Sequence, residues 1–240
     1  GPARAFASSP RRSPMSDELR AEVALGCRIL GLEDQGDFVW GHVSARDPAG
    51  RGVWMKAAAL GFDEVGAANV ILVGWDGEVL EGEGRRHLEY PIHTELMRAR
   101  DDVGAVVHTH APWSVAFAAI EQPLRPVSHE GTLFVPPDIV RFTKTGDLIL
   151  TAGLGADVAA VVGERNAALL VNHGIVTCGP DVVTAVMYAV FLERACRTNL
   201  RALAGGGPKR WSSDDEALAK REHVYSFQQA WDYLARRLER

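Results

Sequence analysis

The chain has 240 residues, of which 47% are hydrophobic and 24% charged, enough for one sizeable hydrophobic core. Its net charge of -5 and the lack of a basic stripe argue against a nucleic acid as partner. No apolar run reaches the length of a membrane span, which argues against a membrane partner.

Cysteine usage and the chain start give two further expectations. Cys27, Cys178 and Cys196 are odd in number and widely spaced, which predicts buried thiols in a reducing compartment and favours a cytoplasmic protein. Gly1-Pro2 resembles the remnant of a cleaved tag. We therefore expect residues 1–14 to be a tag remnant or a disordered extension, and residues 15–240 to form one domain.

The front half of the chain predicts one helix followed by short antiparallel strands. Ser16 before two acidic residues is typical of a helix start, and Asp76-Gly77 is typical of a tight hairpin. The helix is expected from Ser16 to about residue 31, and the strands at 41–46, 53–56, 70–75 and 78–81.

The second half alternates helical patterns with apolar runs, which indicates an α/β domain. Strands are expected at 105–110, 124–127, 167–171 and 175–178, and helices at 89–100, 111–120, 154–165 and 181–204. A last helix is expected from Ser212 and Ser213 through Arg237. Its many aromatic side chains need a covering surface.

Two histidines follow the apolar run that begins at Ala105. His108 and His110 stand two positions apart, and such positions of a strand face the same side of the sheet. A third, His173, follows a second apolar run in Asn172-His173-Gly174, where the glycine allows a tight turn. Three neutral imidazoles at strand ends suit a divalent metal with room left for substrate. Hydrogen-bonded strand-end histidines are the alternative interpretation.

These motifs, together with Glu89 nineteen positions before His108, are similar to those of the class II aldolase and adducin-head family over residues 19–201. The resemblance implies a single-domain, three-layer αβα fold with a largely antiparallel central sheet. The family includes sugar-phosphate aldolases, an epimerase, a dehydratase, decarboxylases and a cytoskeletal head that lacks the metal. Membership therefore implies the fold more firmly than the reaction.

The resemblance also implies roles for the site residues. His108, His110 and His173 would hold one divalent metal per subunit, which could be zinc, manganese, cobalt or ferrous iron. Glu89 would ligate the resting metal or act as general acid and base, although a glutamate in the first helical turn is also an ordinary cap. His93, one helical turn later, would either orient Glu89 or lie behind the ligands without binding the metal.

Three departures from the phosphate-binding members bear on the substrate. Those enzymes carry an asparagine, a Ser-Gly pair and a Ser-Ser pair where this chain has His42, Ala58-Ala59 and His87-Leu88. The hydroxyl donors that would hold a phosphate are thus mostly replaced by groups that suit a carboxylate. The expected substrate-binding residues are His42, Lys56, Arg85, Arg86 and His87. For the two arginines a solvated loop is the alternative.

His129 falls where the aldolases place a tyrosine that reaches a neighbouring subunit's site as proton donor. An imidazole there implies a different proton-transfer step, and a surface histidine at an interface is the alternative. The resemblance implies a homo-oligomer, expected to be a tetramer with sites at subunit interfaces.

The leading hypothesis is a metal-dependent carbon-carbon lyase. We expect a decarboxylase of a small unphosphorylated hydroxy-aromatic or hydroxy/oxo carboxylate, acting through a metal-stabilised enolate as in the family's dihydroxyphthalate decarboxylases. A retro-aldolase of an unphosphorylated hydroxy-oxo acid is the alternative. A metal-free, adducin-like binding module is a third possibility, but it would not need the three histidines.

Overall fold

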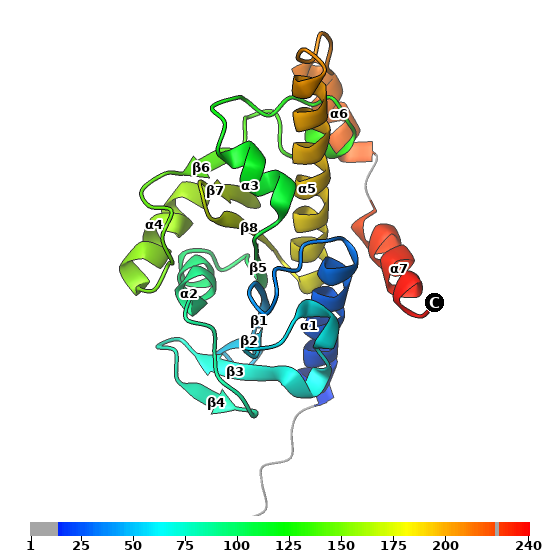
Figure 1. Cartoon of the computed structure of the whole chain (residues 1–240). Coiled ribbons are helices and arrows are strands. Elements are labelled where there is room, and N and C mark those ends of the chain that lie inside the picture. Colours follow the sequence, from blue (N-terminus) through cyan, green and yellow to red (C-terminus); the bar gives the residue numbers. More distant parts are fainter. Residues whose placement is uncertain (1–13, 224–225) are drawn as a thin grey trace, which may run out of the picture.

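The computed structural model describes residues 14–223 and 226–240, so the predicted tag remnant lies outside the described residues except for Pro14 (Figure 1). The helices are α1 (Pro14–Leu32), α2 (Tyr90–Ala99), α3 (Pro112–Ala118), α4 (Ala152–Val162), α5 (Val182–Ala204), α6 (Asp214–His223) and α7 (Phe227–Leu238). The strands are β1 (His42–Arg46), β2 (Gly52–Lys56), β3 (Val70–Gly74), β4 (Val79–Glu81), β5 (Ala105–Thr109), β6 (Val140–Phe142), β7 (Ala167–Leu170) and β8 (Gly174–Gly179). Three short 3-10 turns, η1 (Phe62–Glu64), η2 (Ala67–Asn69) and η3 (Glu130–Leu133), complete the described elements.

The described strands form one 8-stranded sheet in the order β4-β3-β2-β1-β5-β8-β7-β6. Each neighbouring pair is antiparallel except β6 with β7, which is parallel. The predicted α/β class with a largely antiparallel central sheet is confirmed. The order places β1 and β8 on either side of β5, so β5 is the strand around which distant segments meet.

Alternating side chains of the sheet feed two separate cores. In β3, Val70 and Leu72 join the core formed with α1 and α5, whereas Ile71 and Val73 join the core formed with α2 and α4. Figure 1 shows these two helix pairs on opposite sides of the sheet. The three-layer αβα arrangement is therefore confirmed.

Some predicted elements differ from the structure. α1 begins two residues before Ser16. The strand predicted at 124–127 is wrong, because the amides of Leu124 and Arg125 donate to the side chains of Asp138 and Asn199 in place of a strand neighbour. The short strand β6 was not predicted, since its three residues carry too little pattern.

The predicted last helix is also wrong as a single element. Ser213 and Ser226 each accept a hydrogen bond from the amide three residues later, so two separately capped helices, α6 and α7, replace it. Phe227 packs on Tyr188 and Phe191 of α5. Residues of α5 in the same chain therefore cover an aromatic side chain of α7. The aromatic content of this segment is then weak evidence for a partner surface.

The cysteines and the helices carry no membrane or disulfide signature. Cys27, Cys178 and Cys196 are free and buried, and burial raises the thiol pKa of Cys27 and Cys196 to about 12. Over the described residues, no helix combines the length and apolar character that crossing a bilayer requires.

Candidate metal and substrate site

Four side chains from three parts of the fold converge at one end of β5. His108 lies in β5, His110 follows it, His173 precedes β8, and Glu89 precedes α2. One ligand atom from each of these residues lies within 4.8 Å of the others. The structure therefore brings together the four residues that the sequence predicts around a metal.

Close packing at Gly174 allows the histidine rings to meet. A Cβ added there would lie 2.4 Å from the Thr109 carbonyl oxygen and 3.1 Å from ring atoms of both His108 and His110. The tight turn before it is made by Asn172, whose φ is 60°, so the predicted reason for this glycine is wrong. Gly174 is needed for space rather than for the turn.

The hydrogen bonds of the rings determine which nitrogens face the centre of the cluster. Nδ1 of His108 lies 2.9 Å from the Ile175 carbonyl oxygen, and Nδ1 of His110 lies 2.7 Å from a carboxylate oxygen of Asp37. Both oxygens can only accept, so we assign the proton to Nδ1 in each ring. Each Nε2 then offers a lone pair toward the cluster.

Buried nitrogens at this centre have no hydrogen-bond partner in the described part of the chain. They are Nε2 of His108, Nε2 of His110 and both ring nitrogens of His173. Nε2 of His173 lies 3.3 Å from Glu89 Oε1, but the contact is not a well-directed hydrogen bond. Buried polar atoms without partners are rare, and one divalent metal would take up Nε2 of His108, Nε2 of His110 and one ring nitrogen of His173.

The Glu89 carboxylate faces the cluster and makes no capping bond to α2 among the residues described. Its Oε1 accepts a hydrogen bond of 2.7 Å from the Ile149 amide, and its Oε2 lies 3.6 Å from Nε2 of His108. Burial alone would raise the pKa of Glu89, but the His173 and His108 rings and the Ile149 amide lower it to about 2. The carboxylate is therefore ionised at neutral pH.

Two polar residues that the sequence analysis missed position the histidines. The Asp37 carboxylate bonds His110, and Gln35 accepts a hydrogen bond of 2.8 Å from the Thr109 hydroxyl between the two histidines. Gln35 is anchored in turn by a bond of 2.9 Å from its side-chain amide to the Ala189 carbonyl oxygen. Each residue is more than seventy positions before its partner, so no local pattern links them to the site.

A cavity of about 690 Å³ opens beside the cluster. It holds four of the five predicted substrate-binding residues, among them His42 and His87, whose ring centroids are 4.4 Å apart. Its lining residues are Asp37, Val39, Trp40, Gly41, His42, Ala58, Ala59, Arg85, Arg86, His87, Leu88, Glu89, His110 and Leu148. Burial lowers the pKa of His87 to about 3, and a weaker effect of Lys56 adds to this.

The two arginines of the cavity differ in what they contact. The Arg86 guanidinium donates to the Gly77 carbonyl oxygen at 2.6 Å and lies 4.4 Å from the centre of the Tyr90 ring. Arg85 is exposed, and its guanidinium makes no hydrogen bond to any residue that the structure describes. Arg85 is therefore the arginine available to a ligand, whereas Arg86 is engaged in the fold.

His93 bonds partners other than Glu89. Its Nε2 is 2.6 Å from Nδ1 of His42, and its Nδ1 is 2.6 Å from the Ser44 hydroxyl. Desolvation by burial holds the pKa of both His93 and His42 well below the usual range, so both rings are neutral. The hydrogen bonds of His93 thus orient His42. The expectation that His93 orients Glu89 is wrong.

Lys56 is fully buried behind the cavity wall and is not among the described residues that line it. Its ammonium group donates to the Val39 carbonyl oxygen at 3.0 Å and lies 3.2 Å from Nε2 of His87. Burial lowers the pKa of Lys56 to about 8. In this arrangement Lys56 supports His87 and the residue 39 backbone instead of meeting the substrate directly.

His129 lies apart from the cluster within this chain. It is exposed just before η3 and borders a different open cavity with Trp211 and Lys220. Any role in the chemistry would therefore require a neighbouring subunit.

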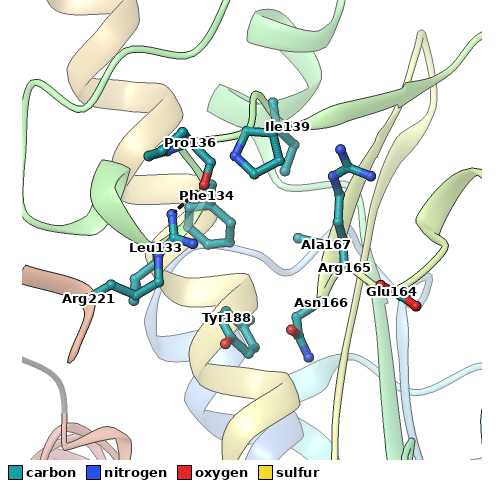
Figure 2. Close-up of a pocket in the computed structure, with 11 residues that line it drawn as sticks. Leu133, Phe134, Pro136, Ile139, Glu164, Arg165, Asn166, Ala167, Tyr188 and Arg221 are labelled. Atoms are coloured by element: carbon teal, nitrogen blue, oxygen red, sulfur yellow. Dashed lines mark hydrogen bonds between the residues drawn. The ribbon is translucent and has the colours of Figure 1, made fainter. Parts of the chain in front are cut away.

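A smaller cavity of about 190 Å³ lies beside α5 (Figure 2). Arg221 and Tyr188 point toward it, but the Arg221 guanidinium already donates to the carbonyl oxygens of Thr132 and Pro136 at 2.8 Å. None of the residues predicted for the site lines this cavity. We therefore place the candidate site at the histidine cluster.

The chain is similar to known proteins over most of its length. Residues 21–200 match the family model described as the Class II Aldolase and Adducin N-terminal domain. The chain is 30% identical to a 3,4-dihydroxyphthalate decarboxylase from Arthrobacter keyseri over 240 aligned positions, which cover 90% of this chain and 93% of the relative.

Two solved structures are similar over nearly the whole chain. An aldolase II superfamily protein from Pseudomonas syringae superposes with a TM-score of 0.85 at 27% identity, covering 95% of each chain. An L-fuculose 1-phosphate aldolase from Glaciozyma antarctica PI12 superposes with a TM-score of 0.79 at 26% identity, covering 96% of this chain and 92% of the other. The class II aldolase-like fold and the expectation of an enzyme of the lyase class are confirmed. The chain belongs to the class II aldolase and adducin N-terminal domain family.

Proposed function

We propose that this protein is a metal-dependent decarboxylase of a small unphosphorylated hydroxy-aromatic carboxylate. The observation that carries the proposal is the set of buried imidazole nitrogens that lack a partner among the described residues, beside a cavity that presents imidazole and guanidinium groups. The similarity to a 3,4-dihydroxyphthalate decarboxylase over nearly the full length supports this substrate class.

The donor set fits one divalent ion per subunit. Three imidazoles, those of His108, His110 and His173, would hold it, with the Glu89 carboxylate adjacent. Zinc, manganese, cobalt and ferrous iron all accept these ligands. When bound, the ion supplies a Lewis acid that stabilises negative charge on substrate oxygens.

The residues around the ion divide the remaining work. The exposed Arg85 guanidinium suits the substrate carboxylate, because a planar fork can donate two parallel hydrogen bonds to it. The neutral rings of His42 and His87 suit the substrate hydroxyls, which they can bind as donor or acceptor. The ionised carboxylate of Glu89 accepts the proton of a substrate hydroxyl as the ligand binds.

Decarboxylation breaks the bond between the carboxyl carbon and the ring. Carbon dioxide leaves, and the electron pair of the broken bond stays on the substrate. A proton must then reach the ring carbon that carried the carboxyl group. Glu89 can return the proton that it accepted, and His129 of a neighbouring subunit is the second candidate donor. The part given to His129 requires a homo-oligomer, which we propose to be a tetramer with sites at its interfaces.

Three free, buried thiols are typical of a reducing compartment, and we propose a cytoplasmic location.

The test is to incubate the metal-loaded protein with 3,4-dihydroxyphthalate and to follow carbon dioxide and dihydroxybenzoate. Metal-dependent release of both supports the proposal. Release of an aldehyde from a hydroxy-oxo acid, with no turnover of the aromatic acid, would contradict the decarboxylase proposal and support a retro-aldolase. That alternative is favoured by the similarity to an L-fuculose 1-phosphate aldolase structure.

A further inference from the structure

Apolar side chains border the cavity beside the histidine cluster and remain exposed. Trp40 is 54% exposed, Leu88 64% and Leu148 42%, and all three line the cavity. Phe38 is 81% exposed and packs edge-on against Trp40, with the ring centroids 5.7 Å apart. Large apolar side chains gathered at the border of a cavity that also presents imidazole and guanidinium groups indicate a ligand with an apolar body.

The turn at residues 37–41 presents Phe38 in a strained conformation. Its φ is 48°, in the left-handed region that bulky side chains rarely adopt. Because the ring is mostly exposed, burial of the ring does not offset this strain. A strained, exposed aromatic residue at the border of the cavity points to a role in binding.

The same turn is held firmly by the residues around it. The Trp40 amide donates to the Asp37 carbonyl oxygen at 2.9 Å, and the Lys56 ammonium group donates to the Val39 carbonyl oxygen at 3.0 Å. The Asp37 carboxylate bonds His110. The position of the two exposed rings is therefore coupled to the orientation of a predicted metal ligand.

We infer that Trp40, which lines the cavity, and Phe38, which packs against it at the border, form an aromatic shelf that binds the ring of an aromatic hydroxy acid. The inference rests on the proposed function and assigns the residues that bind the aromatic ring of its substrate. Leu88 and Leu148 supply further apolar wall, and Arg85 is available for the carboxylate. The cavity volume of about 690 Å³ accommodates a substituted single ring. An aliphatic acid of similar charge would leave the shelf in contact with water.

The experiment compares two ligands by calorimetric titration of the metal-loaded protein: 3,4-dihydroxybenzoate and the aliphatic hydroxy acid L-malate. Trp40→Ala and Phe38→Asn should each weaken dihydroxybenzoate binding roughly ten-fold and leave malate binding unchanged. Trp40→Phe should retain most of the affinity. Phe38→Asn should also raise Tm, because asparagine tolerates a positive φ, which separates lost binding from lost folding.

Tyr233→Leu is the matched control, since Tyr233 is 53% exposed on α7 and does not line this cavity. It should bind both ligands like the parent. Unchanged dihydroxybenzoate affinity in both shelf variants would overturn the inference, as would equal weakening of both ligands. Dissociation of an oligomer with both affinities intact would also overturn it and would assign the rings to a subunit interface. Selective binding without carbon dioxide release from 3,4-dihydroxyphthalate would refute the decarboxylase but support the shelf.

Discussion

The Asp37 carboxylate lies 2.7 Å from Nδ1 of His110, although 73 positions of chain separate the two residues. A carboxylate that accepts the ring proton of a metal-binding histidine fixes its tautomer and raises the basicity of the other nitrogen. Asp37→Asn should therefore lower metal affinity roughly ten- to a hundred-fold, measured by competition with a chelating dye. Asp34→Asn, at an exposed position three residues earlier, is the control and should bind metal like the parent. Equal affinity in the two variants would contradict this role.

Replacing Glu89 separates its chemistry from its place in the fold. In Glu89→Gln the side-chain oxygen can still accept the Ile149 amide, so Tm should stay close to that of the parent. Activity should fall by roughly a hundred-fold or more, because the amide cannot take up a proton. Glu89→Ala should also lower Tm, since it leaves the buried Ile149 amide without a partner. An active Glu89→Gln protein would show that this carboxylate carries no proton in the reaction.

The two neighbouring arginines should respond differently to truncation. Arg85→Ala should raise KM for carboxylate substrates roughly ten- to a hundred-fold with little change in Tm, because it removes a charged hydrogen-bond donor that faces the cavity. Arg86→Ala should lower Tm, because it removes the bond to the Gly77 carbonyl oxygen and the contact with Tyr90. Steady-state kinetics and thermal melts of both proteins test the contrast. The reverse pattern would exchange their roles.

Acid should destabilise the metal-free protein from about pH 6.5 downward. Burial lowers the pKa of His87 from 6.5 to about 3, so below pH 6.5 the unfolded chain binds a proton that the folded chain does not. Each such histidine removes about 1.4 kcal/mol of stability per pH unit within this window. Glu89, with its pKa lowered from 4.5 to about 2, adds to the loss below pH 4.5.

Denaturant melts of the metal-free protein between pH 7.5 and pH 5 test this dependence. Stability should fall with pH in the parent and fall less steeply in His87→Asn. If the stability of the parent is constant or rises as the pH is lowered, the buried histidine rings, that of His87 among them, are not held neutral in the fold.

Local patterns predicted the parts of the site that depend on one strand or one helix end. The spacing of His108 and His110 placed both rings on one face of β5, and Glu89 was expected beside them. The partners of these residues depend on which strands are neighbours. His93 meets Ser44 and His42 because β1 pairs with β5 beneath α2, and spacing within α2 cannot show this.

Lys56 illustrates the same limit for a substrate-binding residue. Its charge favoured contact with a carboxylate, but in β2 its side chain is fully buried and ends at Val39 and His87. Whether a side chain lines a cavity or supports its wall depends on which distant segments pack over it. The sequence of one strand does not show those segments.

The most direct test of the metal centre is calorimetric titration of a divalent ion into the metal-free protein and into His173→Ala. This histidine is the informative one, because in the described structure neither of its ring nitrogens makes a hydrogen bond that the substitution would break. The account predicts one ion per chain for the parent, and loss of high-affinity binding in His173→Ala while its Tm without metal stays close to the parent's. Binding of the ion to His173→Ala with the parent's affinity and stoichiometry would contradict it.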